Sequence, residues 1–351
     1  MPTTETATGQ GSAPVSRKHP LTPSVDALLG GAERREPFVN PDGRSAAGFE
    51  RVWIDGTAHI VKYVHLDHDF TMRVSGDLGC RSVRAWACGL LDAAPDLIDH
   101  AIVGAATGYG RNGWGVALLM RDVSGELLPA GDSPQLTDEH ASFLDHLAGF
   151  CAATWGWRDD PVSGPGLLPY AARWAWFGYA ALDGERHLGW PERVPRVATA
   201  GWQRFTERAP ADLAWLVERL RRDVTPLARA LRQTPSCLLH GDVKASNRGR
   251  AKDGRTVLID WAYVGEGPAC HELAWHLALD RSRLPLSKEA TAELFRAALE
   301  RHGVQTDGWW DRQLRLCLLG ALVQFGWEKA LGDDDEFNWW CDAARPGAAM
   351  L

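Results

Sequence analysis

The chain has few cysteines, and they do not follow a pattern that would bind zinc or build a disulfide framework. Its 351 residues contain seven cysteines, and no two of them are spaced as C-x-x-C. Zinc sites and small disulfide-rich domains both need cysteines at short, regular spacings. We therefore expect buried thiols in a reducing cytosol, and hence a cytoplasmic protein.

The sequence also lacks a long apolar run and an excess of basic residues. Its most apolar stretch, residues 316–323, is too short to span a bilayer, and no signal-peptide core stands near the N-terminus. The net charge is −7, whereas a nucleic-acid-binding protein would present a basic face. We therefore expect neither a membrane nor a nucleic acid as a partner, and the oligomeric state stays unknown.

Length and composition are those of a folded protein with room for two lobes. Hydrophobic residues make up 45% of the chain and charged residues 24%, as in ordinary globular proteins. Residues 1–35 are rich in Thr, Ser, Gly, Pro and charge and have no apolar periodicity. We expect a mostly disordered lead-in there, with a short helix at 25–29.

Strand patterns dominate the first third of the chain, and helical patterns dominate the rest. Residues 45–64 have the pattern of two strands joined by a turn at Asp55-Gly56. Helical apolar spacing begins at residue 137. The further helical stretches are 167–181, 192–207, 211–233, 270–279, 287–302 and 308–331. This order predicts a small strand-rich lobe and a larger helical lobe, which is an α+β arrangement.

The strongest chemical signal lies between residues 238 and 261. Asp242 and Asn247 have the spacing of the kinase loop H-x-D-x-x-x-x-N, in which the Asp accepts the proton of the attacking hydroxyl and the Asn binds magnesium. Asp260 follows a buried strand pattern after a hairpin turn. The hairpin would bring Asn247 and Asp260 together as oxygen ligands of a hard cation.

Two further polar residues flank Asp242. Lys244 either neutralises charge on the transferring phosphoryl group or is a solvated lysine, and the sequence leaves both open. His240 is expected to bond to backbone groups and fix the shape of the loop, because that is the commoner use of a histidine at this place in a loop.

These residues resemble a known family. His240-Gly241-Asp242 with Asn247, followed by Ile259-Asp260-Trp261 and Gly265, is similar to the aminoglycoside phosphotransferase and choline kinase-like family, whose hallmarks are H-G-D-x-x-x-x-N and I-D-x-x-x-x-G. The resemblance implies a bilobal protein-kinase-like fold. Residues 36–120 would form a nucleotide-binding N-lobe, and residues 121–351 a helical C-lobe with the catalytic loop and the substrate site.

The resemblance also implies which residues bind the nucleotide. Lys62, in the second strand of the hairpin, would hold the phosphates, and Ser45 and Gly48 would lie in the loop above them. Met120 and Arg121 would lie at the hinge between the lobes, where backbone groups bond a purine. Recognition by backbone groups leaves almost no trace in the sequence and so does not distinguish adenine from guanine. The expected donor is therefore ATP or GTP.

The chain departs from the family at one point of this site. Family members pair the phosphate lysine with an acid on the next helix, but the helix expected at 80–91 contains no Asp or Glu. Asp77, just before that helix, is the nearest substitute, and Ser82 takes the usual position of the acid.

The implied function is a kinase that uses Mg²⁺ and transfers the γ-phosphoryl group to a hydroxyl of a small molecule. Asp242 and Lys244 would be catalytic, and Asn247 and Asp260 would hold the metal. Our first expectation for the acceptor is an antibiotic, either an aminoglycoside or a nucleoside antibiotic, with resistance as the result. A metabolic kinase for a sugar or an amino alcohol is the alternative, and a kinase-fold binding protein that has lost its chemistry is another.

An acidic run near the chain end bears on the acceptor. In aminoglycoside-modifying members, acids in this region hold the cationic drug, so the resemblance makes Asp333, Glu336 and Trp339 candidate acceptor-binding residues. Four consecutive acids are more often a solvated cap or loop, and that reading stays open.

Overall fold

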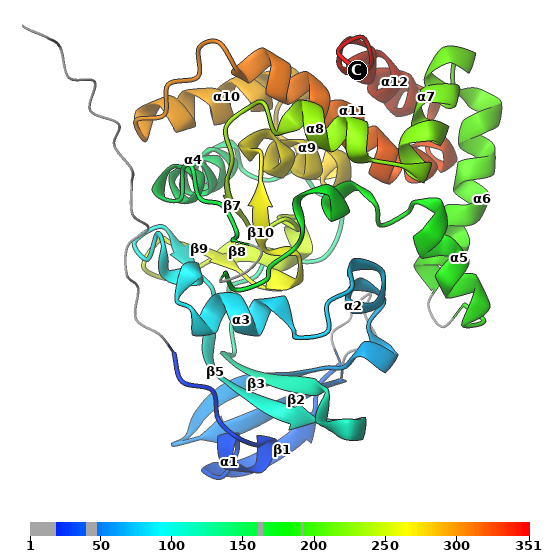
Figure 1. Cartoon of the computed structure of the whole chain (residues 1–351). Helices are drawn as coiled ribbons and strands as arrows, with labels where there is room; N and C mark the ends of the chain where they lie inside the picture. The colour runs from blue at the N-terminus through cyan, green and yellow to red at the C-terminus, as the bar shows by residue number, and fades with distance from the viewer. Residues whose placement is uncertain (1–18, 40–47, 161–163, 191–192) are drawn as a thin grey trace, which may run out of the picture.

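The computed structural model describes residues 19–39, 48–160, 164–190 and 193–351. These residues form a strand-rich lobe and a larger helical lobe (Figure 1). Ser45 lies outside the described residues.

One antiparallel sheet forms the smaller lobe. Its order is β1-β2-β3-β6-β5, and every neighbouring pair of strands is antiparallel. The turn between the second and third strands uses Asp55 and Gly56, both at positive φ, as a tight hairpin turn requires. The strands are β1 (Ala32–Pro37), β2 (Gly48–Ile54), β3 (Thr57–Val64), β5 (Ile102–Tyr109) and β6 (Gly115–Arg121).

Part of the stretch 1–35, expected from the sequence to be mostly disordered, is folded, and residues 1–18 of it lie outside the described residues. The short helix α1 (Val25–Leu28) lies at the position expected for it, and β1 begins at Ala32. Leu29 is buried in a cluster with Val61 and Leu119 of the sheet. Apolar contact with the sheet, which the local composition does not reveal, explains why this part of the lead-in is folded.

The opposite face of the sheet continues into the core of the helical lobe. Ile60 and Leu118 belong to the same buried cluster as Trp86 and Leu91 and the interior of the helical lobe. Two short helices, α2 (Phe70–Ser75) and α3 (Arg81–Ala87), lie between the sheet and that lobe (Figure 1).

The helical lobe is organised around α11, which contacts α6, α9 and α12. Its largest fully buried side chains include Trp174, Phe205 and Trp340. The helices of the lobe are α4 (Thr137–Ala153), α5 (Tyr179–His187), α6 (Arg193–Arg208), α7 (Ala211–Arg222), α8 (Thr225–Leu231), α9 (Ala269–Leu279), α10 (Lys288–Arg301), α11 (Trp310–Leu331) and α12 (Asp334–Ala348).

Short strands in this lobe include residues 248–258, which form the hairpin here called the catalytic hairpin. One small sheet has the order β4-β9-β8, with β4 parallel to β9, and β7 pairs with β10 in another. The strands are β4 (Ile98–Asp99), β7 (Cys237–Leu239), β8 (Arg248–Arg250), β9 (Thr256–Leu258) and β10 (Gly265–Gly267).

Some helices differ from the sequence prediction. Only a short 3-10 turn and α5 occupy the stretch 167–181, and the stretch 211–233 is broken at Asp223, whose backbone is extended, into α7 and α8. The acidic run begins a helix, α12, which the sequence analysis did not identify.

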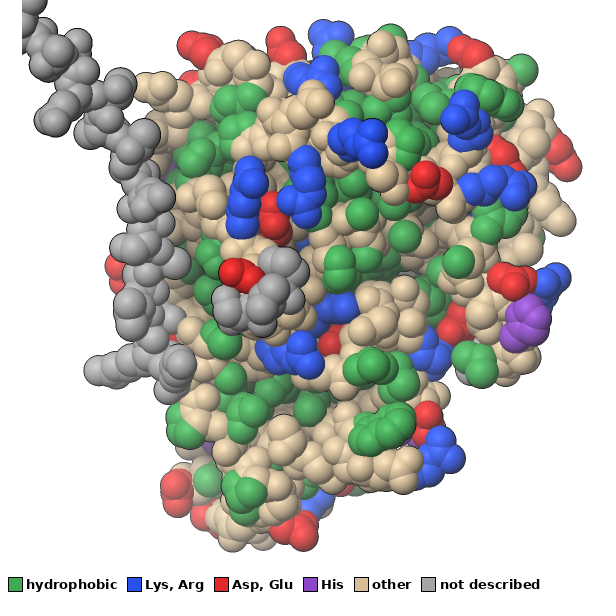
Figure 2. Space-filling model, in the orientation of Figure 1, with side chains coloured by type: hydrophobic (Ala, Val, Ile, Leu, Met, Phe, Trp, Pro, Cys, Tyr) green, Lys and Arg blue, Asp and Glu red, His purple; other side chains and the backbone are tan. Residues whose placement is uncertain are grey.

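The surface carries charges of both signs. Figure 2 shows Lys and Arg side chains interspersed with Asp and Glu side chains over one face. Within the part of the chain that the structure describes, no helix is both long and apolar enough to cross a bilayer.

Candidate active site

The hairpin formed by β8 and β9 brings the predicted metal ligands to one place. Arg248 pairs with Leu258 in its ladder, and the backbone N–H of Ile259 donates to the carbonyl of Asn247 at 2.9 Å. Asp260, at the end of this hairpin, has a positive φ of 64°, a conformation that is uncommon for residues other than glycine. Asn247 and Asp260 both line one cavity.

The loop before the hairpin has its backbone fixed by buried polar groups. Gly241 has φ +83°, and a Cβ there would lie 2.7 Å from the carbonyl oxygen of Tyr263, so only glycine fits. His240 accepts from the N–H of Asp242 through Nδ1 at 3.1 Å, so its Nε2 carries the proton and donates to the carbonyl of Ile259 at 2.9 Å. These contacts agree with the structural part expected for His240.

Asp242 is almost fully buried and has three side-chain donors. Its Oδ1 accepts from Trp275 Nε1 at 3.0 Å, and its Oδ2 accepts from Lys244 Nζ at 2.7 Å and from Asn247 Nδ2 at 2.8 Å. Burial raises the pKa of Asp242 above its ordinary value, although Lys244 acts in the opposite direction. The carboxylate is therefore held in one orientation and binds a proton more readily than an exposed aspartate does.

Lys62 of β3 reaches across to the hairpin. Its Nζ lies 2.8 Å from Asp260 Oδ1. Burial would lower the pKa of Lys62, but Asp260 and Asp69 more than offset it and raise the pKa. Burial would likewise raise the pKa of Asp260, but Lys62 and Lys244 hold it at about 2. Both groups are therefore charged at neutral pH.

A cavity of about 170 Å³, here called the active-site cavity, collects these side chains between the two lobes. Its polar lining residues include Lys62, Asp242, Lys244, Asn247 and Asp260. Its aromatic lining residues include Trp176, Phe177, Trp275, Phe325 and Trp327, and Glu328 also lines it. The polar side chains are suited to phosphates and a cation, and the aromatic side chains to an organic acceptor.

The polar donors fit a magnesium ion that also keeps phosphate and water ligands. Asn247 donates to Asp242 through Nδ2, which leaves its Oδ1 as the atom for a cation. Together with the carboxylate of Asp260, this gives two hard oxygen donors, and magnesium in kinases binds few protein groups. Among the described residues no group of three or more His, Cys, Asp or Glu side chains could hold a metal by itself.

The predicted nucleotide residues take different positions. Gly48, the first residue of β2, pairs with Tyr63 in the ladder beside Lys62. Met120 lies with Lys62 and Asp260 around a smaller adjoining cavity. Arg121 ends β6; its guanidinium pairs with Asp99, and its backbone N–H donates to the carbonyl of Ala101 at 2.9 Å. Neither of these groups is therefore free for the role expected at the hinge.

An acid that the sequence analysis did not identify also lies near Lys62. Asp77 lines the smaller adjoining cavity together with Lys62, and its carboxylate accepts from the N–H groups of Gly79 and of Arg81, the first residue of α3. Asp69 instead is the N-cap of α2, is 4% exposed, and contributes to the raised pKa of Lys62. It precedes the helix that was expected at residues 80–91, and its signal in the sequence is that of an ordinary N-cap.

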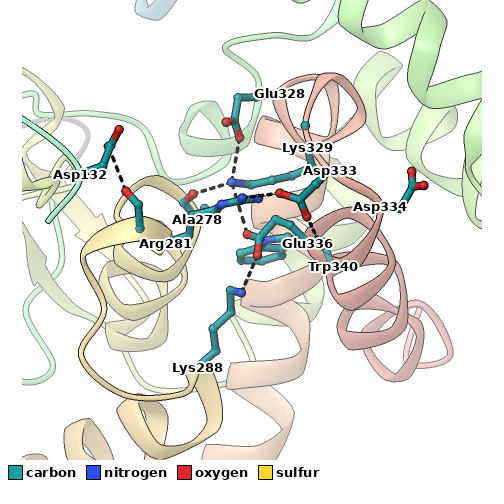
Figure 3. Close-up of polar contacts among 12 residues, drawn as sticks. Asp132, Ala278, Arg281, Lys288, Glu328, Lys329, Asp333, Asp334, Glu336 and Trp340 are labelled. Carbon is teal, nitrogen blue, oxygen red and sulfur yellow. Dashed lines mark hydrogen bonds and ion pairs between the residues drawn. The ribbon is translucent and has the colours of Figure 1, made fainter. Parts of the chain in front are cut away.

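The acidic run near the chain end is occupied by contacts within the protein (Figure 3). Asp333 caps α12 and pairs with Arg281. Glu336 lies 2.6 Å from Lys288 Nζ and accepts from the indole of Trp340 at 2.7 Å. Trp339 donates to Glu289 at 2.7 Å. The described lining of the active-site cavity includes none of Asp333, Glu336 and Trp339.

Solved structures share this fold at low sequence identity. The choline kinase LicA from Streptococcus pneumoniae aligns over 93% of this chain and 96% of its own, with 12% identity and a TM-score of 0.50. A microcompartment-associated aminopropanol kinase aligns over 92% and 94%, with 11% identity and a TM-score of 0.52. The amicoumacin kinase hAmiN, solved with AMP-PNP, Ca²⁺ and Ami, aligns over 91% and 89%, with 13% identity and a TM-score of 0.51.

These likenesses confirm the predicted α+β, bilobal, kinase-like fold. Comparison with curated proteins finds no match. Residues 82–311, about two thirds of the chain, match the sequence model of the phosphotransferase enzyme family. The match confirms the resemblance drawn from His240, Asp242, Asn247 and Asp260. The chain therefore belongs to the phosphotransferase enzyme family and is a small-molecule kinase of it.

Proposed function

We propose that this protein transfers the γ-phosphoryl group of ATP or GTP, in a magnesium-dependent reaction, to a hydroxyl group of a small molecule. One observation carries the proposal: Lys62 meets Asp260, 198 residues further along the chain, in the same cavity as Asp242. In phosphoryl transfer a protein acts chiefly by positioning the reactants and neutralising charge. A lysine and two carboxylates in one cavity can do both.

Each side chain has a separate task in this proposal. Magnesium, when bound by Asn247 and Asp260, neutralises charge on the phosphate oxygens. Lys62 binds phosphate oxygens from the side of the smaller lobe. Asp242 orients the acceptor hydroxyl and accepts its proton, for which its raised pKa is favourable. Lys244, beside Asp242, stabilises charge on the group in transit.

We further propose that the acceptor is a compact alcohol with a single cationic amino group. Several aromatic side chains line the cavity, and aromatic rings attract cations. Glu328 adds a carboxylate whose side chain is 46% exposed and lies 2.7 Å from Lys329 Nζ. Asp242 and Asp260 are engaged by Lys244 and Lys62. Glu328 is itself paired with Lys329, and Asp69, which also lines the cavity, caps α2. The aromatic rings and the half-exposed Glu328 therefore suit one positive charge better than the several of an aminoglycoside.

For an aminoglycoside acceptor, the resemblance made the acidic run the candidate binding site. Asp333, Asp334 and Glu336 pair with Arg281, Arg208 and Lys288. An aminoglycoside would have to displace several of these arginines and lysines, whereas an amino alcohol with one charge would compete only with Lys329 for Glu328. This difference favours the amino alcohol. A nucleoside antibiotic does not depend on that run, so it belongs in the same test.

Mass spectrometry of an acceptor panel tests the proposal. The panel holds choline and other amino alcohols, the uncharged alcohol with carbon in place of the choline nitrogen, sugars, aminoglycosides and nucleoside antibiotics. With magnesium and ATP or GTP, we expect a gain of about 80 Da, one phosphoryl group, on an amino alcohol, and none with the Asp242→Asn variant. A gain on an antibiotic alone would establish the resistance function instead. Nucleotide binding without any transfer would favour a binding protein.

Glu328→Gln tests the acceptor class separately. The variant keeps the shape of the side chain and removes its charge, so the KM of the cationic acceptor should rise about tenfold. The KM of the uncharged alcohol should stay the same. An equal effect on both would contradict a charge-based role of Glu328.

A further inference from the structure

Helix α9 and its C-cap hold the catalytic loop at three points. Glu272 accepts from the N–H of Gly241 at 3.0 Å, Trp275 donates to Asp242, and Asp280, the C-cap of the helix, accepts from the N–H of Ala245 at 2.8 Å. Glu272 and Trp275 are three residues apart and therefore share one face of the helix. The first two contacts fix the loop at the proposed base, and the third lies further along, toward the metal ligand.

Asp280 contacts both sides of the segment that carries Asn247. Its Oδ1 receives the Ala245 N–H, and its Oδ2 lies 3.2 Å from Arg248 Nη2. Ala245 stands two residues before Asn247, and Arg248 directly follows it. A single carboxylate therefore restrains the backbone before the metal ligand and the side chain after it.

Asp280 is itself held in place by two histidines. His276 Nδ1 lies 2.8 Å from Asp280 Oδ2, and His276 Nε2 lies 3.0 Å from His140 Nε2 on α4. Burial lowers the pKa of both histidines, that of His140 to about 3. Since both are then neutral, His276 donates to Asp280 and accepts from His140, a single arrangement of protons.

Arg248 makes this cluster depend on the charge of Asp280. Its side chain is 2% exposed, and its guanidinium carbon lies 3.9 Å from the centre of the Phe143 ring. Burial lowers the pKa of Arg248 to about 10, while Asp280 acts to raise it. A buried guanidinium without its carboxylate would be costly, so replacing Asp280 by a neutral residue should displace Arg248 and the strand start next to Asn247.

We propose that Asp280 is a positioning residue for the metal ligand Asn247. This role rests on the proposed function, because Asn247 binds metal only if the protein is a magnesium-dependent kinase. Asp280 lies behind the loop and acts through Ala245 and Arg248. Groups that orient metal ligands typically change metal affinity or activity by about 10- to 100-fold when they are removed.

Binding of Mn²⁺ to the AMP-PNP complex, followed by electron paramagnetic resonance, tests this role without any turnover. The Asp280→Asn variant should bind Mn²⁺ about tenfold more weakly than the wild type. In turnover, the magnesium concentration for half-maximal rate should rise by a similar factor. The KM of the acceptor should change less than about twofold, because Asp280 is not among the described residues that line the active-site cavity.

Asp145→Asn is the matched control. Asp145 also contacts an arginine and a histidine, Arg301 at 2.6 Å and His302 at 3.3 Å, on the outer side of α4. It should leave Mn²⁺ binding unchanged. If Asp280→Asn does not fold, the double variant Asp280→Asn with Arg248→Met, which leaves no unpaired buried charge, should fold and show the same weakening.

The outcomes separate the two proposals. A folded Asp280 variant that binds Mn²⁺ as tightly as the wild type would overturn the positioning role and leave the proposed function intact. A wild type that binds no Mn²⁺ in the presence of AMP-PNP would overturn the proposed function itself.

Discussion

Lys62 Nζ lies 2.8 Å from Asp260 Oδ1 and so joins the sheet of the smaller lobe to the end of the catalytic hairpin. The lysine is 7% exposed, and Asp69 lies close enough to add to its raised pKa. Lys62 therefore faces the carboxylate proposed to hold the metal as well as a second acid. Phosphates that enter the cavity would meet a lysine and a metal ligand already side by side.

Removing this lysine should weaken nucleotide binding and slow transfer. Lys62→Met keeps the length of the side chain but leaves Asp260 and Asp69 without their cation. We expect the rate to fall by about 100-fold or more, as when other charge-stabilising donors are removed, and the nucleotide Kd to rise. Isothermal titration with the non-hydrolysable nucleotide and steady-state rates measure the two effects. Lys252→Met, in the exposed hairpin turn, is the control, and equal behaviour of the two variants would contradict the role of Lys62.

Asp242 should matter for the rate and little for nucleotide affinity. Its two oxygens are fixed by Trp275, Lys244 and Asn247, and Asn at this position would keep the shape while losing the ability to accept a proton. We expect kcat to fall by about 100- to 10,000-fold in Asp242→Asn, with the nucleotide Kd within about threefold of the wild type. Stopped assays of product and nucleotide titrations give both values. A kcat that is maintained would mean that the acceptor hydroxyl loses its proton by another route.

The hairpin residues show why part of this site could be predicted from the sequence. Asp242 and Asn247 are held by one short loop, and Asp260 follows within the same hairpin, so their spacing alone reports their proximity. Lys62 is different, because nothing local links it to Asp260, and its assignment came from the resemblance. The order of strands and helices was likewise visible as apolar periodicity.

Asp69 and Glu328 could not be found in the same way. Asp69 has the local signature of an N-cap, and its proximity to Lys62 arises from the position of α2 between the sheet and the helical lobe. Glu328 lies in a long buried helix, and only packing shows that it lines the cavity. Helix α12 had a signal that was overlooked: Asp333 as N-cap, acids in the first turn, and Phe337, Trp340 and Ala344 at helical spacing.

The acidic run gives a prediction about stability that separates it from acceptor binding. Glu336 is nearly buried and contacts Lys288 and, at 3.7 Å, Lys329 (Figure 3). Glu336→Gln should destabilise the protein by about 2–3 kcal/mol, because two lysines lose a buried partner. Urea unfolding measures this, and the exposed Asp335→Asn in the same turn should change it by less than about 0.5 kcal/mol. The acceptor KM should be the same in both variants; a raised KM in Glu336→Gln would restore the acidic run as an acceptor site.

Glu272 gives a prediction about pH. It is fully buried and contacts the Gly241 N–H. Burial raises its pKa from the ordinary 4.5 to about 7, although that N–H and Arg173 act in the opposite direction. The folded protein thus holds this proton more tightly than the unfolded chain does. The stability that the group contributes is complete below pH 4.5 and is lost as the pH rises through 7.

Glu272→Gln isolates this contribution, because the amide keeps an oxygen for the Gly241 N–H and cannot ionise. Urea unfolding of both proteins between pH 4.5 and 8 measures this contribution. As the pH rises to 7, the unfolding free energy of the variant should increase by about 3 kcal/mol relative to that of the wild type, and the difference should then level off. The size of this change follows from the difference between the pKa of Glu272 in the unfolded chain and its pKa in the folded protein. That difference depends on how completely α9 and the catalytic loop exclude water from the carboxyl group. A difference that stays constant with pH, or that moves in favour of the wild type, would show that Glu272 is ionised in the folded protein, with Gly241 and Arg173 outweighing burial.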